Sequence, residues 1–359
     1  MNNYHFGRLN RGVHTSMHRS VWMDRTPVLH CSEPNEMTTN RPPLPLEALA
    51  AAASTPLSRR TLLAGAAAIA GGLLFAPAAA RAADAPLEAA ASFEAPAAIL
   101  RAVAGPRARV ATIIAAGSEP HGFEPSIRDL KRLAHASLFV WNGLGMEPWA
   151  AAAAKASGNS KLVARALAEG IDIDAAFPKR TEKSAQDSGT VRDPHLWLAP
   201  AGARVLARAA AEALSAADPA GRAAYEENLA AFEAELQKLS QRFEDELQHA
   251  RRRVFFCGHA SFGWLCREFG IEQRAASGVF AEGEPSPRRL AQLIDECRAL
   301  GVKTVFAEAG ESSAVLDTLA EEADARVVPL FTMETAENGQ PYLDRLAANL
   351  NAIAASLCE

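Results

Sequence analysis

The sequence predicts an α/β protein of two parallel-sheet lobes joined by one long helix. Apolar, strand-like runs alternate with helical stretches through residues 88–145 and again through 252–357. Such alternation with short links is typical of a parallel sheet covered on both faces. Between these regions lies one long amphipathic segment. Glu-Pro-Ser also occurs twice, at 124–126 and 284–286, each time before a helical stretch, a repeat that two lobes of similar build would produce.

The first lobe is expected to span residues 84–216. Its opening part has the pattern strand, helix, strand, helix, strand, in the segments AAASFEA, PAAILRAVAG, RARVATIIAAG, SIRDLKRLAHA and SLFVWNGLG. Ser126 has the position of a helix N-cap, and Asp129 follows three residues later, as in a capping box. The last of these segments is predicted to be a buried strand that ends at Gly143.

Residues 217–250 are expected to form the connecting helix. Apolar side chains recur there every three or four residues with charged residues between them: Tyr225, Leu229, Phe232, Leu236, Leu239, Phe243 and Leu247. About 30 helical residues span roughly 45 Å, more than the width of one small domain. The simplest interpretation is a rigid strut in a monomer. A self-associating coiled coil is the alternative.

The second lobe is expected to span residues 251–359. Strands are predicted in RRVFFCGH, VKTVFAEAG and ARVVPLF, and helices in SFGWLCREFG, SPRRLAQLIDECRALG and the C-terminal YLDRLAANLNAIAASL. The second of these helices has Ser286 as its N-cap, Pro287 in its first turn and Gly301 at its end. Gly270 ends the helix before it.

The first 83 residues are not expected to belong to the fold. Residues 1–57 are polar and irregular, and Met37 is a candidate for the true start, which would make this leader an artefact of the gene model. Residues 58–83 have the pattern of a twin-arginine signal peptide, with Arg59 and Arg60 ahead of an apolar run. Cleavage would leave a mature chain that starts near Ala83 in the periplasm. A transmembrane anchor is the alternative.

Composition excludes some partners. The chain has 359 residues, 49% apolar and 22% charged, and a net charge of −5 gives no general attraction to nucleic acid or anionic membranes. Four of the five cysteines lie beyond the leader, at positions 257, 266, 297 and 358, and none belongs to a CxxC pair. A zinc ribbon or thioredoxin-like site is therefore not expected. Disulfides and buried free thiols both remain open for these four residues.

Three histidines share a setting that suggests a metal site. His121 follows one predicted strand, His259 ends another, and His195 comes just after a loop. In parallel sheets, ligands collect beyond the carboxyl ends of the strands. Three neutral imidazoles that converge there would bind a borderline metal such as Zn²⁺. The alternative is three separate, hydrogen-bonded histidines. We expect His135 and His249, in polar helical positions, to lie on the surface.

Several motifs together resemble a known family. They are GSEPHGFEPS with IRDLKRLAHASLFVWNGLGMEPW, then DPHLWLAP, GHASFGWLCREFG, EPSPRRLAQLI and VFAEAGESS, in this order along nearly all of the mature chain. In this combination the chain resembles the metal-binding solute-binding proteins of zinc and manganese ABC importers, the ZnuA/TroA-like family. The resemblance implies two α/β lobes bridged by a long helix, with the metal in the cleft between them.

The resemblance also implies the ligands. Three family ligands fall on His121, His195 and His259. The fourth is normally an acid directly after a strand that ends in Pro-Leu, but here Phe331 follows Pro329-Leu330 and cannot ligate. Replacements that we leave open are Glu308, Glu119, Glu334 and a water molecule. Zinc-uptake members often have a histidine-rich stretch before the second ligand, and residues 177–193 contain none.

The expected function is therefore that of an exported, non-enzymatic metal receptor of an ABC importer. It would capture Zn²⁺ and pass it to a membrane permease with its ATPase. Mn²⁺ is less suited, since it prefers carboxylates to imidazoles. A zinc hydrolase or hydratase with three histidines and an open coordination position is a second hypothesis. A binding protein with a changed ligand, an adhesin or an accessory factor is a third, and Phe331 is the feature that supports it.

Overall fold

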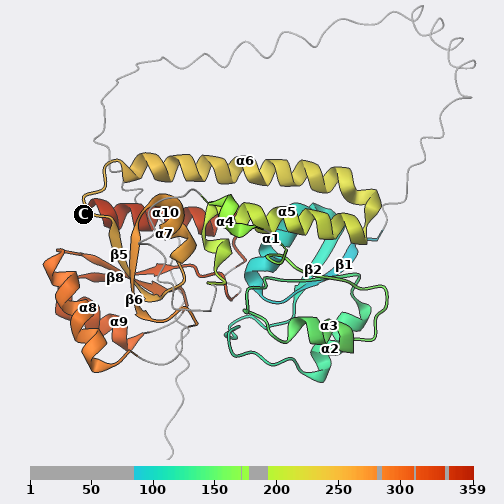
Figure 1. The fold of residues 1–359 in the computed structure, drawn as a ribbon, viewed down its shortest axis with the longest axis horizontal. Helices are drawn as coiled ribbons and strands as arrows, with labels where there is room; N and C mark the ends of the chain where they lie inside the picture. Colours follow the sequence, from blue (N-terminus) through green and yellow to red (C-terminus); the bar gives the residue numbers. More distant parts are fainter. Residues whose placement is uncertain (1–84, 171, 178–192, 281–284, 311–312, 336–338) are drawn as a thin grey trace, which may run out of the picture.

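The computed structural model describes residues 85–170, 172–177, 193–280, 285–310, 313–335 and 339–359 (Figure 1). The leader and the twin-arginine segment lie outside the described residues, as does most of the loop before His195. Within the described part of the chain, no helix combines the length and the apolar character that a membrane crossing requires.

Two parallel four-stranded sheets form the centres of two lobes. The first contains β1 (Leu87–Ala91), β2 (Ala108–Thr112), β3 (Leu138–Trp141) and β4 (Val163–Ala166) in the order β2-β1-β3-β4. The second contains β5 (Val254–His259), β6 (Glu272–Ser277), β7 (Thr304–Glu308) and β8 (Arg326–Leu330) in the order β6-β5-β7-β8. The two orders are equivalent, because in each lobe the first strand of the chain lies between the second and the third. The predicted fold class is confirmed.

Helices cover both faces of each sheet. In the first lobe they are α1 (Glu94–Ala104), α2 (Ile127–His135), α3 (Ala150–Ala156), α4 (Ile173–Ala176) and α5 (Pro200–Ala217). In the second they are α7 (Gly263–Phe269), α8 (Pro287–Ala299), α9 (Ala314–Ala323) and α10 (Tyr342–Cys358). Short 3-10 turns occur at Gly105–Arg107, Leu196–Leu198 and Pro219–Gly221.

Local sequence explains where several helices begin and end. The backbone N–H of Ser126 donates to the Asp129 carboxylate at 2.8 Å, as the capping-box pattern predicts for α2. Ser286 caps α8, since its hydroxyl accepts from the backbone N–H of Arg289 at 3.2 Å. Gly270 ends α7 in a left-handed conformation with φ 66°, which glycine adopts without a steric penalty.

The long helix α6 (Arg222–Leu247) runs along both lobes (Figure 1). It follows the 3-10 turn at Pro219–Gly221 and contacts α1 and α5 of the first lobe and α10 of the second. Its apolar face is buried within the chain: the Phe243 ring lies 4.8 Å from that of Phe269, and the Phe232 ring 5.7 Å from that of Tyr342. The coiled-coil alternative is therefore wrong, because the chain itself covers the face that a second copy would need.

One continuous hydrophobic core joins the inner faces of the two sheets under α6. It contains, for example, Ile99 and Leu206 of the first lobe together with Phe255 and Leu346 of the second. Two smaller clusters lie on the outer faces, under α2 and α3 and under α8 and α9. Since opening the lobes would expose part of the shared core to water, this packing favours small rather than large relative motions.

Three cysteines of the second lobe, Cys257, Cys266 and Cys297, are buried free thiols. Burial raises the pKa of the Cys266 thiol well above its usual value, and a nearby Cys257 raises it further. Cys257 has a raised pKa for the same main reason. These thiols therefore stay protonated at neutral pH and behave as small apolar side chains.

Candidate metal centre

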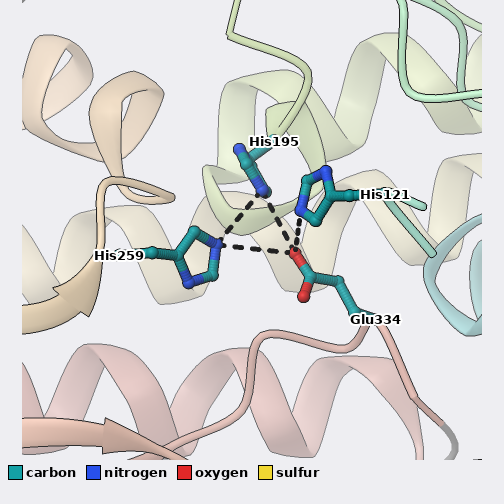
Figure 2. Close-up of side chains that lie close together, drawn as sticks. All are labelled: His121, His195, His259 and Glu334. Atoms are coloured by element: carbon teal, nitrogen blue, oxygen red, sulfur yellow. Dashed lines mark hydrogen bonds and ion pairs between the residues drawn. The ribbon is translucent and has the colours of Figure 1, made fainter. Parts of the chain in front are cut away.

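Four side chains from both lobes converge at one point between them (Figure 2). His121 lies in the turn between β2 and α2, His195 directly precedes the 3-10 turn at Leu196–Leu198, and His259 is the last residue of β5. Glu334 comes from the segment after β8. The carboxyl ends of the strands thus deliver side chains to the region between the lobes, as expected for parallel sheets.

Four of the six distances between the donor atoms are close to the edges of a tetrahedral zinc site. Glu334 Oε1 lies 3.1 Å from His195 Nε2, 3.5 Å from His121 Nε2 and 3.6 Å from His259 Nε2. The Nε2 atoms of His195 and His259 are 3.4 Å apart. All four donors lie within 4.8 Å of one another. Zinc–ligand bonds of about 2.0–2.1 Å give tetrahedron edges of roughly 3.3–3.4 Å. The cluster therefore fits such an ion with only small adjustments.

A carboxylate orients the imidazole of His195. Asp193 Oδ1 lies 2.8 Å from His195 Nδ1 and also accepts from the backbone N–H of His195 at 2.9 Å. The indole of Trp264 holds Asp193 in turn, by donating to its backbone carbonyl at 2.9 Å. A proton on Nδ1 that points to a carboxylate leaves the Nε2 lone pair free for a metal.

His259 is oriented in the same way by Glu308, the last residue of β7. His259 Nδ1 makes a short hydrogen bond to Glu308 Oε1. Glu308 was one of the open candidates for the fourth ligand, and the structure places it behind the imidazole rather than in the cluster. A carboxylate in this position fixes the tautomer of the histidine and makes Nε2 a stronger ligand.

His121 is held differently, by the geometry of its own turn. The Glu119 carboxylate accepts from the backbone N–H groups of His121 at 2.7 Å and Gly122 at 3.0 Å. Nδ1 of His121 has no hydrogen-bond partner among the described residues. Glu119 Oε1 is 3.9 Å from His121 Nε2, farther than Glu334 Oε1, and its side chain is 53% exposed. Glu119 therefore shapes the turn, and Glu334 is the carboxylate within the cluster.

The acid lies three residues beyond the position that the resemblance indicated. The backbone of Phe331 is fixed by Asn349, whose side chain accepts from its N–H at 2.8 Å and donates to its carbonyl at 2.7 Å. The chain then reaches Met333, which is fully buried with a left-handed φ of 58°. This conformation is rare for a residue with a large side chain. It directs the next residue, Glu334, toward the histidines.

The charges in the cluster stabilise one another. Burial alone would raise the pKa of Glu334, but its interactions with the three histidines, a hydrogen bond to His195 and ion pairs with the other two, hold it well below its usual value. Burial would lower the pKa of His259, yet its hydrogen bond to Glu308 and its ion pair with Glu334 raise it to about 10. The pKa of His195 is raised in the same way, against burial, by Asp193 and Glu334. In the metal-free protein an ionised Glu334 therefore lies beside His195 and His259, whose raised pKa values favour their protonated forms.

All three predicted histidines are thus brought together, whereas His135 and His249 are not part of the cluster. His135 at the end of α2 and His249 just after α6 are exposed, as expected. The hydrolase hypothesis required an open coordination position, and a carboxylate oxygen occupies the fourth corner of the cluster. No role was predicted for Asp193 from the sequence, although this acid lies two residues before the candidate ligand His195.

The variant Glu308→Gln tests the orienting role of the carboxylate behind His259. Glutamine keeps the size of the side chain but removes the charge that holds the Nδ1 proton. We expect the dissociation constant for zinc to rise by about 10–100-fold, as for other outer partners of ligating histidines. X-ray absorption should still show three imidazoles. Glu321→Gln, an exposed change on α9, is the matched control, and equal zinc affinity in both variants would contradict the assignment.

The fold and the cluster define a two-lobed binding protein with a candidate transition-metal centre between its lobes. Comparison with known proteins agrees with this class: the family model described as "Zinc-uptake complex component A periplasmic" matches residues 90–356. The chain belongs to this family, as the motifs predicted.

Relatives and solved structures show the same relation. The high-affinity zinc uptake system protein ZnuA of Bacillus subtilis is 31% identical over 253 residues, which cover 68% of this chain and 79% of that protein. The crystal structure of AdcAII from Streptococcus pneumoniae superposes with a TM-score of 0.68 at 29% identity, over 76% of this chain and 100% of that one. The Zn(II)-bound ZnuA-like domain of AdcA from the same organism gives 0.64 at 26% identity, with the same coverage.

Proposed function

We propose that this protein is an exported solute-binding protein that captures Zn²⁺ and delivers it to the permease of an ABC importer. His121, His195, His259 and Glu334 are the proposed ligands. The observation that carries this proposal is the set of distances from Glu334 Oε1 to the three Nε2 atoms, 3.1, 3.5 and 3.6 Å. Membership of the zinc-uptake family and the zinc-bound state of a structural relative support it.

The donor set favours zinc over manganese. Three neutral imidazoles and one carboxylate are borderline ligands, whereas the harder Mn²⁺ prefers more oxygen donors. Titration of the purified metal-free protein with each ion tests this. We expect zinc to bind in the micromolar range or tighter, and more tightly than manganese. Zinc binding no tighter than millimolar would contradict the proposal.

Delivery requires release of the ion to a membrane partner with its ATPase, and the shared core favours a small closure of the lobes. Cells that lack this protein should take up less zinc when a chelator limits the supply. The wild-type gene should restore uptake, and a gene for a variant that cannot bind zinc should not.

Export through the twin-arginine pathway is proposed from Arg59 and Arg60 alone, and retention of an Arg59→Lys, Arg60→Lys precursor in the cytoplasm would support it.

Zinc affinity is expected to rise with pH. His259, with a pKa of about 10 in the metal-free protein, carries a proton at neutral pH that zinc must displace. Because a raised pKa means that the proton competes below that value, the dissociation constant should fall by about tenfold per pH unit for each displaced proton. Competition with a chelator from about pH 6 to 8 measures the slope, and calorimetry in buffers of different ionisation enthalpy counts the protons. A flat profile would contradict this expectation.

A further inference from the structure

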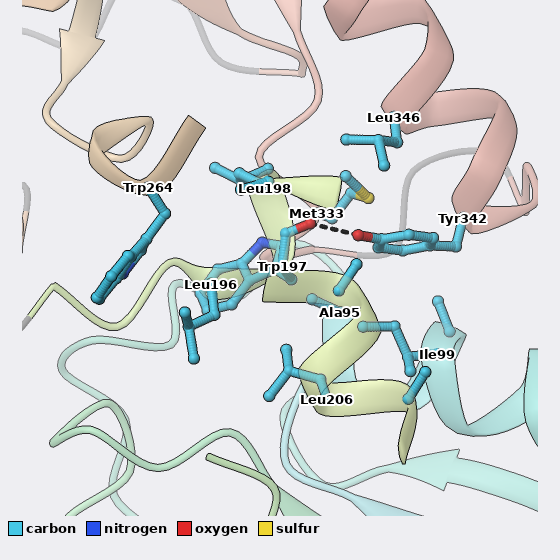
Figure 3. Close-up of a cluster of buried hydrophobic side chains, with 14 of the residues drawn as sticks. Ala95, Ile99, Leu196, Trp197, Leu198, Leu206, Trp264, Met333, Tyr342 and Leu346 are labelled. Atoms are coloured by element: carbon cyan, nitrogen blue, oxygen red, sulfur yellow. Dashed lines mark hydrogen bonds between the residues drawn. The ribbon is translucent and has the colours of Figure 1, made fainter. Parts of the chain in front are cut away.

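Two buried hydrogen bonds join the lobes directly behind the metal centre. The indole Nε1 of Trp197 donates to the backbone carbonyl of Thr332 at 2.7 Å. The hydroxyl of Tyr342 makes a short hydrogen bond to the carbonyl of Trp197 (Figure 3). We call these three residues, Trp197, Thr332 and Tyr342, the Trp197 clamp. Trp197 belongs to the segment that opens α5, and the other two belong to the second lobe.

The clamp lies close in sequence to two proposed ligands. Trp197 follows His195 by two residues, and Thr332 precedes Glu334 by two residues. The Trp197 ring also packs on the imidazole of His195, with ring centroids 5.1 Å apart. The hydrogen bond from Trp197 to Thr332 therefore links the backbones that carry His195 and Glu334, whose donor atoms are 3.1 Å apart.

The environment makes this link rigid. Trp197 is 0% exposed, Thr332 4% and Tyr342 3%, so neither hydrogen bond can be exchanged easily for one to water. Burial raises the pKa of Tyr342, so that its hydroxyl keeps its proton and donates. Met333, between Thr332 and Glu334, has a left-handed backbone that persists only where its surroundings constrain it. Thr332 provides such a constraint on one side.

We infer that Trp197 is a positioning residue for the metal: its indole N–H fixes Thr332 and thereby holds Glu334 at ligand distance from His195. This inference rests on the proposed function. It assigns a role in metal affinity to the tryptophan of the DPHLWLAP motif, which would otherwise count only as a core residue. The main consequence is kinetic, since a loosened Glu334 would let zinc dissociate faster.

Trp197→Phe tests the inference, because it keeps an aromatic ring and removes the N–H donor. We expect the dissociation constant for zinc to rise about tenfold or more, mainly through faster dissociation, in line with other partners that orient ligands. Tyr342→Phe removes only the hydroxyl of the second hydrogen bond. This variant should also weaken zinc binding. It therefore tests the inference even if Trp197→Phe does not fold.

Phe93→Leu is the matched control for packing. Phe93 lies edge-on to the Trp197 ring at 5.1 Å and is buried, but it takes no part in the clamp. The variant should lower the melting temperature of the metal-free protein and leave the zinc dissociation constant within about twofold. If it weakens zinc binding as much as Trp197→Phe does, general packing explains the effect and the inference is wrong.

A double-mutant cycle with Glu334→Ala provides a readout that a merely structural role would not change. If the clamp acts by holding Glu334, Trp197→Phe should change zinc affinity by less than about threefold once Glu334 is absent. An equal effect in both backgrounds would overturn the inference, as would unchanged affinity of Trp197→Phe alone. The two possible failures are distinguishable. If the wild-type protein does not bind zinc, the proposed function is overturned and the inference with it; if the wild type binds zinc and the variants behave as just described, only the inference is overturned.

Discussion

Replacing His259 with alanine is expected to weaken zinc binding by more than about a hundredfold, beyond the 10–100-fold typical of residues that only orient a ligand. His259 is tightly constrained by its surroundings. It ends β5, is 2% exposed, and is held between Glu308 and Glu334. Alanine removes one donor and leaves two carboxylates, the buried Glu334 and the partly buried Glu308, without this partner.

Two measurements check this result. Competition with a chromophoric chelator gives the dissociation constant, and X-ray absorption should show two imidazoles around zinc instead of three. Zinc should also raise the melting temperature of the wild type, because a ligand at 100 times its dissociation constant stabilises the native state by about 2.7 kcal/mol. The variant should lose most of this shift. His249→Ala, at an exposed site, is the control, and equal affinity of the two variants would exclude His259 as a ligand.

Replacing Glu334 with alanine is the second large effect that we expect, also more than about a hundredfold in zinc affinity. This change removes the only negative charge within the donor set. Interactions with the three histidines hold its pKa well below the usual range, against the effect of burial. Conversely, Glu334 helps to raise the pKa values of His195 and His259. Without it, these histidines lose protons more easily.

The pH profile therefore separates loss of a ligand from general damage. In Glu334→Ala, fewer protons should remain for zinc to displace, so the rise of affinity with pH should be shallower than in the wild type. Glu119→Ala serves as the comparison, since that carboxylate binds backbone N–H groups of its own turn. We expect its effect on affinity to be clearly smaller. If Glu119→Ala has the larger effect, Glu119 rather than Glu334 completes the shell.

The free energy of unfolding of the metal-free protein should depend on pH through the same charged groups. A depressed carboxylate pKa, as for Glu334, stabilises the fold above the usual pKa of glutamate, and this contribution is lost as the pH falls through the lower native value. A raised histidine pKa, as for His259, stabilises the fold below the usual histidine value and is lost as the pH rises toward about 10. Both contributions are fully present only between the usual pKa values of glutamate and histidine, at mildly acidic pH.

Sequence patterns predicted the features that depend on neighbours along the chain. The fully apolar LFVW strand, the capping pattern of Ser126 and Asp129, and the three-to-four periodicity of α6 reflect local geometry, and all are present in the structure. The three histidines were identifiable because each follows a strand or a loop within a recognisable motif. Strand ends of parallel sheets meet at one edge, so their convergence could be expected before any coordinates were known.

Only the tertiary structure decided how the site is completed. Three acids or a water were compatible with the sequence, and the place of Glu334 in the cluster depends on a left-handed turn at Met333 and on the distance between two lobes. Glu308 lies behind His259, where it orients the imidazole, because β7 lies beside β5 in the sheet. Such relations join residues far apart in the chain, through packing and hydrogen bonds like those of Trp197. Local pattern cannot encode them, and therefore the ligands from strand ends were predictable while the fourth corner was not.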